Sequence, residues 1–170
     1  MAELTHHQQI SVWQHDSYGC IPAGVEWLLR YCGINVGDSL QFQLKHDQRY
    51  QGRDNNFKNV KQSAEVDYPY ARFSVEVYDL PQTGKDKLLR VENLIDDDIP
   101  ALISVQLSYQ KDGRIGFHIV PVVKIDDETV TVSNWEGKPE LKSFPRQDLI
   151  DRHDHYSGHD ILFIKTCNRP

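Results

Sequence analysis

The sequence lacks the features of a membrane-embedded or nucleic-acid-binding protein. No apolar run approaches the roughly 18 uninterrupted residues that a membrane-spanning helix needs, and the best candidate, 117–123, contains His118 and Pro121. Lys and Arg number 19 against 25 Asp and Glu, so the formal net charge is −6. Because nucleic-acid affinity comes largely from cations that displace counterions, this balance disfavours an unspecialised nucleic-acid binder. We therefore expect no membrane insertion and no nucleic-acid partner.

The N-terminal residues show no secretory signal. Residues 1–14, MAELTHHQQISVWQ, lack a basic start, an apolar centre and a small-residue cleavage site. The default expectation is therefore a cytoplasmic location.

Cysteine is also scarce. An odd count of three excludes a complete disulfide framework and leaves at least one free thiol. Cys20 and Cys32 flank a predicted helix whose twelve residues would separate them by about 18 Å, far beyond the roughly 7 Å that a disulfide tolerates. Cys32 follows Val25 and Leu29 at helical spacing and is interpreted as a small core residue. Cys167 lies near the C-terminus and is interpreted as incidental, which leaves Cys20 for separate treatment.

The order of predicted elements indicates an α+β fold in one domain, residues 1–170. A helix is expected from about residue 20 or 21 to 32, because Pro22 suits a first helical turn and Gly33 a left-handed helix end. One or two short helices and loops are expected within the polar segment 38–70. Further predicted elements are strand 72–78, helix 85–95, strand 101–107, a tight turn at 111–113 and strands 117–125, 128–135 and 161–165. We thus expect a helical lobe, about 1–70, packed on an antiparallel sheet, about 71–170.

Cys20 is the candidate nucleophile. A thiol attacks as thiolate, and the N-terminus of a helix is expected to lower its pKa. Gly19 removes side-chain bulk on the side from which a polypeptide substrate would approach. The side-chain amide of Gln14 and the backbone N–H of Cys20 could together stabilise an oxyanion. The alternatives are a structural cysteine at a helix start and an ordinary surface glutamine.

His118 is the candidate base, since it interrupts an otherwise apolar strand, where an imidazole is either buried and hydrogen-bonded or catalytic. Asn134 ends the next predicted strand, and its amide oxygen could fix the imidazole tautomer. The two face the same side only if the connection at residues 126–127 has three residues or the hairpin contains a bulge. Trp135 could shield the bond from water, or be purely structural.

This pattern resembles the papain-like cysteine peptidases: Gln14, then Cys20 at a helix start, His118 on a strand, and Asn134 followed by Trp135. It is closer still to the subgroup of bacteriocin-processing, double-glycine leader peptidases, through Gly19-Cys-Ile-Pro-Ala, Leu28-Leu-Arg-Tyr-Cys-Gly33 and the Asp-Ile-Pro100 element before a strand. The resemblance covers about two thirds of the chain and leaves 38–70 unmatched.

The resemblance implies a papain-like fold and thiol attack by Cys20 on an amide carbonyl. His118 would act as general base and then acid, Asn134 as orienter and Gln14 as oxyanion donor. Gly19, Phe117 and Trp135 would contact a peptide or protein substrate, and no metal or cofactor would be required.

Two departures and several alternatives accompany this hypothesis. The Cys-Gly-Ser/Ala-Cys-Trp signature of secreted papains is absent, and so is the membrane portion of the exporter-linked processing enzymes. The same thiol chemistry would serve an acyl transferase or a glutamine deamidase, and a non-catalytic peptide-binding module is a third alternative. Segment 38–70 is a candidate specificity loop. The His-rich run 151–160 could ligate a metal but is better interpreted as a solvated loop.

Overall fold

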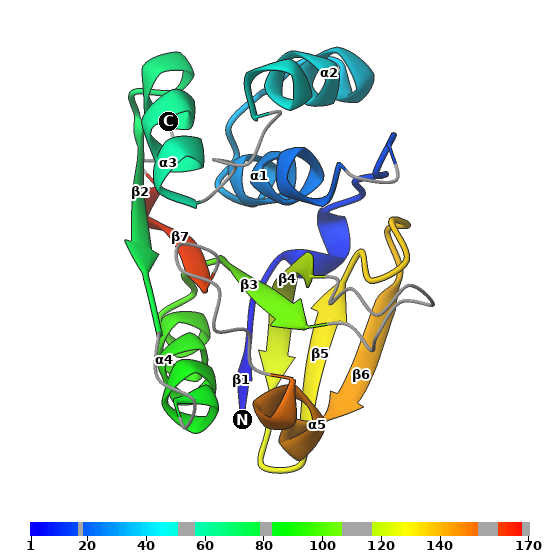
Figure 1. Ribbon diagram of the computed structural model, residues 1–170, viewed down its shortest axis with the longest axis vertical. Coiled ribbons are helices and arrows are strands. Elements are labelled where there is room, and N and C mark those ends of the chain that lie inside the picture. The colour runs from blue at the N-terminus through cyan, green and yellow to red at the C-terminus, as the bar shows by residue number, and fades with distance from the viewer. Residues whose placement is uncertain (17–18, 51–56, 79–82, 107–116, 153–159, 168–170) are drawn as a thin grey trace.

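The computed structural model describes residues 1–16, 19–50, 57–78, 83–106, 117–152 and 160–167 (Figure 1). It confirms the α+β fold: helices come first along the chain and an antiparallel sheet follows. The N-terminal helices are α1 (Cys20–Tyr31), α2 (Ser39–Tyr50) and α3 (Phe57–Asp67). Two further α-helices, α4 (Gly84–Asp96) and α5 (Arg146–Asp151), lie between strands, and a 3-10 turn spans His7–Gln9.

The sheet is antiparallel throughout. Its strands are β1 (Ala2–Glu3), β2 (Ala71–Glu76), β3 (Ala101–Gln106), β4 (Phe117–Ile125), β5 (Thr129–Ser133), β6 (Leu141–Pro145) and β7 (Ile161–Cys167). They follow the order β2-β7-β3-β4-β5-β6, and β1 pairs with β4 off this path. Strand β4 is thus central, and helices α1 to α3 lie together at one end of the molecule (Figure 1).

Three short elements were not predicted. Strand β1 has only two residues, and it brings the N-terminus into the sheet although it belongs to the expected helical lobe. Strand β6 is almost wholly exposed, and α5 buries Leu149 alone. None of them carries an apolar periodicity long enough to be recognised. The predicted turn at 111–113 lies outside the described residues.

Helix α1 is the best-buried helix of the fold and fixes where Cys20 lies. Ten of its twelve residues are buried, and Trp27, Leu28 and Leu29 are fully enclosed. The backbone at Gly24 comes so close to β3 that an added Cβ would lie 2.8 Å from the Leu102 side chain. Gly33 ends the helix at φ +74°, the left-handed conformation expected of it. The helix is therefore anchored against the sheet along its length.

Within the described residues, no helix combines the length and the apolar character needed to cross a bilayer.

Candidate active site

Cys20 is the first residue of α1 and lies against strand β4. Cys20 is part-buried, and the backbone N–H groups of Ile119, Cys20 and Ile21 act on its thiol and lower its pKa. The first of these donors directly follows His118 in β4. The structure therefore brings the predicted nucleophile beside the strand that carries the predicted base.

The electrostatic environment of the thiol differs from the sequence-based expectation. Burial raises the pKa of Cys20 above the ordinary thiol value and outweighs the three N–H groups, which lower it. The prediction of a lowered pKa at the helix N-terminus is wrong in its net direction, because the sulfur loses more hydration than these donors replace. In the resting protein the thiol is protonated at neutral pH.

The His118 ring is hydrogen-bonded to a main-chain carbonyl group. Its Nε2 lies 2.7 Å from the carbonyl oxygen of Trp135, which can only accept, so Nε2 carries a proton. In the neutral ring Nδ1 is then the acceptor. Burial lowers the pKa of His118, while the backbone carbonyls of Trp135 and Asn134 raise it to a smaller extent. The ring is therefore neutral at pH 7 and competent to take a proton.

The β4–β5 hairpin meets the condition set from the sequence. Asp126 N–H donates to the carbonyl of Thr129, which closes a two-residue connection, and the pairing shifts register between Val122 and Lys124. This bulge shifts the pairs on the His118 side by one residue, which is the register that the hypothesis required, although Asn134 itself lies one residue beyond the end of β5.

The side chain of Asn134 nevertheless bonds elsewhere. Its Nδ2 donates to the carbonyl of Val12 at 2.7 Å, and its Oδ1 accepts the hydroxyl of Ser133 at 2.8 Å. Strand β5 ends at Ser133, and Asn134 adopts φ +62°, which turns the chain out of the ladder. Among the described residues, the hydrogen bond that orients the imidazole comes from the Trp135 carbonyl, and the Asn134 side chain ties this turn to the N-terminal segment.

Trp135 covers the imidazole. The two rings meet edge to face, with centroids 5.3 Å apart and planes at 76°. On its other side Trp135 packs against Phe144 at 4.5 Å, and Lys142 lies over both rings. The bond that Trp135 was expected to shield, between the His118 and Asn134 side chains, is not made, and Trp135 contacts the imidazole ring itself. Phe117 is part-buried at the start of β4, next to His118.

Gln14 lies in a loop whose hydrogen bonds reach the start of α1. Its Nε2 donates to the carbonyl of Asp16 at 2.6 Å, and the same carbonyl accepts the N–H of Gly19 at 3.0 Å. The Gln14 N–H donates to Gly137 in the turn after β5. An amide nitrogen has two N–H groups, so the bond to Asp16 orients it and leaves a second donor. Gln14 is thus linked to both the helix side and the hairpin side of the site.

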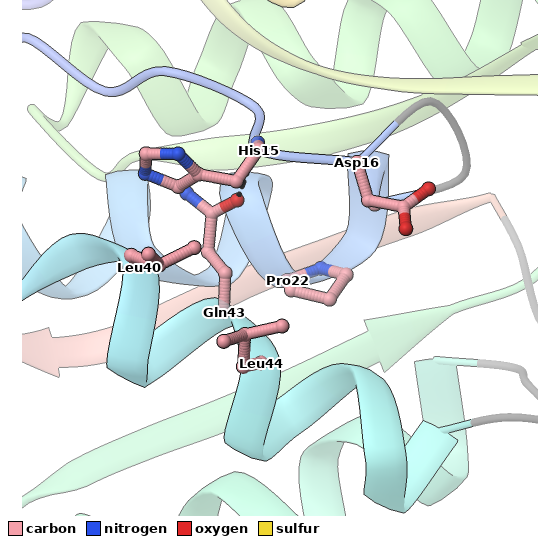
Figure 2. Close-up of a pocket in the computed structure, with 7 residues that line it drawn as sticks. His15, Asp16, Pro22, Leu40, Gln43 and Leu44 are labelled. Carbon is pink, nitrogen blue, oxygen red and sulfur yellow. Dashed lines mark hydrogen bonds between the residues drawn. The ribbon is translucent and has the colours of Figure 1, made fainter.

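A pocket opens beside the start of α1 (Figure 2). Pro22, Leu40 and Leu44 form its apolar part, and its other lining residues are His15, Asp16, Gly19 and Gln43. Gly19 is buried, and an added Cβ would lie 3.2 Å from the Asp16 carbonyl oxygen. The glycine therefore permits the tight turn that leads into Cys20.

The other predicted features need brief comment. Cys32 is fully buried, as expected of a core residue, but it is disulfide-bonded, whereas Cys20 is free. No group of three potential metal ligands occurs within the described part of the chain. Most of the His-rich run, residues 153–159, lies outside it.

Comparison with known proteins bears on the fold. No family model matches the sequence, and no curated protein matches it. A solved structure does: a protein described as a C39-like peptidase from Bacillus anthracis superposes with a TM-score of 0.67 over 98% of both chains, at 12% sequence identity.

The chain has the fold of a C39-like peptidase. This confirms the papain-like fold expected from the sequence resemblance. At 12% identity the likeness extends to the fold alone, so the roles of the site residues rest on the geometry described above.

Sequence reasoning missed the residues that support the Gln14 loop. Gln43 on α2 is 4% exposed and Glu26 on α1 is fully buried, and the two are hydrogen-bonded. Gln43 sits in a Gln-rich polar segment, where nothing distinguishes it from a surface residue. Glu26 could have been noticed from the sequence, because it is an acidic residue between Val25 and Trp27 in an otherwise apolar part of the predicted helix.

Proposed function

We propose that the protein is a cysteine peptidase or amide hydrolase that cleaves a peptide or isopeptide bond through a thioester on Cys20. The observation that carries the proposal is the position of Cys20 at the start of α1, packed against β4 where the Ile119 N–H that follows His118 acts on its thiol, in a chain with a C39-like peptidase fold. A peptide or protein is the corresponding substrate.

The first half-reaction uses a neutral thiol and a neutral imidazole. The Cys20 thiol passes its proton to Nδ1 of His118 as Sγ attacks the carbonyl carbon of the scissile amide. The Trp135 carbonyl holds the opposite ring nitrogen and stabilises the imidazolium that forms. The second N–H of the Gln14 amide and the backbone N–H of Cys20 donate to the oxyanion. His118 then protonates the leaving amine as the C–N bond breaks, which leaves the acyl group on sulfur.

The second half-reaction releases the acyl group. His118 takes a proton from water, the resulting hydroxide attacks the thioester, and the carboxylic acid leaves as the thiol is restored. An amine in place of water would make the protein an acyl transferase, and a side-chain amide as the first substrate would make it a deamidase.

The pocket beside Gly19 is the proposed binding place for an apolar substrate side chain. Leu40 and Leu44 are 43% and 46% exposed there and would be covered by such a side chain. Gly19, Phe117 and Trp135 would contact the substrate nearer the reacting bond.

A peptide library with mass-spectrometric detection tests the proposal. Wild-type protein should produce cleaved peptides, and Cys20→Ala should produce none. Cys20→Ser is the closest match in size, because it replaces only the sulfur by oxygen. Products that carry an added amine would indicate acyl transfer, and a mass gain of about 1 Da at glutamine would indicate deamidation.

The second candidate is a non-catalytic peptide-binding module, in which the Cys20 thiol takes no part in chemistry. In that case wild type and Cys20→Ala would bind library peptides equally and leave both sets uncleaved.

A further inference from the structure

The side chain of Gln43 spans the two peptide groups that flank Gln14. Its Nε2 donates to the carbonyl of Trp13 at 2.7 Å, and its Oε1 accepts the N–H of His15 at 3.1 Å. Figure 2 shows Gln43 reaching from α2 toward the segment that carries His15. One amide thus fixes the backbone before and after the residue proposed to bind the oxyanion.

Glu26 sets the orientation of this amide. Its Oε2 accepts Nε2 of Gln43 at 2.7 Å and the hydroxyl of Ser39 at 2.9 Å, and its Oε1 accepts Nε of Arg30 at 2.8 Å. A carboxylate only accepts, so a flipped Gln43 would place oxygen against oxygen. The flip would also lose both bonds to the loop. Glu26 therefore locks Gln43 in the one orientation that matches Trp13 and His15.

The bonds are buried, which makes them directional and costly to leave unmade. Gln43 is 4% exposed and Glu26 is fully buried. Apolar residues would pack α1 against α2 at a smaller desolvation penalty, so packing alone does not explain a charged network there. What the network supplies is a single conformation for residues 13–15.

We propose that Gln43, oriented by Glu26, is a positioning residue that holds Gln14 in place to stabilise the oxyanion. The inference rests on the proposed function for its catalytic consequence. Three main-chain groups around Gln14 are then fixed: the Trp13 carbonyl and His15 N–H by Gln43, and the Gln14 N–H by Gly137. Gln43 itself touches no reacting atom in this scheme.

The first test needs no catalytic turnover and probes the clamp, by which we mean the two hydrogen bonds from the Gln43 side chain to Trp13 and His15. Gln43→Met keeps the length of the side chain but removes both hydrogen bonds to the loop, and Gln41→Met on the exposed face of α2 is the matched control. Amide hydrogen exchange at His15 should accelerate about tenfold in Gln43→Met and stay unchanged in Gln41→Met. Gln43→Ala replaces Gln43→Met should the latter fail to fold. Unchanged exchange at His15 in a folded variant would overturn the clamp.

The second test asks whether Gln43 acts through Gln14, by a double-mutant cycle on a cleaved library peptide. Gln43→Met should lower kcat about tenfold with KM within about twofold, and should change kcat less than about twofold in the Gln14→Ala background. An equal loss in both backgrounds would overturn the positioning role. A wild-type rate no higher than that of Cys20→Ala would overturn the proposed function, whereas the exchange result decides the clamp independently.

Discussion

The two sides of the site are built by different means. On the helix side, Gln14 and its loop are held by side chains, chiefly Gln43 and Glu26, and by the Asp16 carbonyl. On the hairpin side, His118 is held by the main-chain carbonyl of Trp135. A substitution can delete a side chain but only displace a backbone carbonyl. The helix side should therefore be sensitive to the identity of its supporting residues, and the hairpin side to backbone conformation.

The largest effect is expected at His118, which both sides serve. His118→Ala removes the proton acceptor and should lower kcat/KM about a thousandfold, measured on the best library peptide. His6→Ala, an exposed histidine far from β4 in sequence, is the control and should retain full activity. A loss of less than tenfold in His118→Ala would show that another group takes the thiol proton.

Gln14 tests the helix side. Gln14→Ala removes one oxyanion donor and should lower kcat about a hundredfold with a smaller change in KM. Gln14→Glu, of the same shape, places a negative charge near the oxyanion and should be at least as damaging. The exposed Gln8→Ala is the control. A kcat in Gln14→Ala equal to that of wild type would exclude this amide from the oxyanion site. The helix side would then not support catalysis through Gln14.

Asn134 tests the hairpin side. Glycine adopts positive φ freely, so Asn134→Gly keeps the turn and its carbonyl and should lower kcat/KM about tenfold or less. Asn134→Val strains the same backbone and should cost more activity and stability, followed by thermal unfolding. Equal and large losses in both, as great as in His118→Ala, would indicate that the side-chain amide orients the imidazole after all.

The smallest expected effect is a shift in pH dependence. Burial lowers the pKa of His118 from the ordinary value of 6.5, so the acid limb of kcat/KM should lie below pH 6.5, where the ring becomes protonated. Trp135→Ala exposes the ring while the backbone carbonyl remains, so its pKa should rise and the acid limb should move to higher pH. An acid limb that stays in place would show that Trp135 does not keep water from the ring.

Much of the fold could be predicted from the sequence because local signals coincide with burial. Pro22 and Gly33 bracket α1, and the apolar runs of β3 and β4 are central strands. Segment 38–70 proved to hold two helices, α2 and α3. The elements that were missed, β1, β6 and α5, depend on tertiary pairing rather than on their own pattern.

The sequence singles out candidate site residues, whose roles stay predictions, but it does not predict their contacts. The order of Gln14, Cys20, His118 and Asn134 indicated a thiol site, and a bulge in the hairpin was one of two alternatives stated for bringing His118 and Asn134 to the same face. Two things depend on tertiary structure: the pKa of Cys20, set by its burial, and the direction of the Asn134 side chain, set by φ +62°. Neither the pKa of Cys20 nor the direction of the Asn134 side chain can be deduced from residue spacing along the chain.

The most direct test of the account is a trapped acyl-enzyme. Wild-type protein mixed with an activated ester of a cleaved library peptide, quenched in acid and analysed by intact mass and peptide mapping, should carry one acyl group on Cys20. Cys20→Ala should carry none, and His118→Ala should acylate more slowly. A wild-type protein that cleaves the peptide without acylation of Cys20, or an equal adduct in Cys20→Ala, would contradict the account.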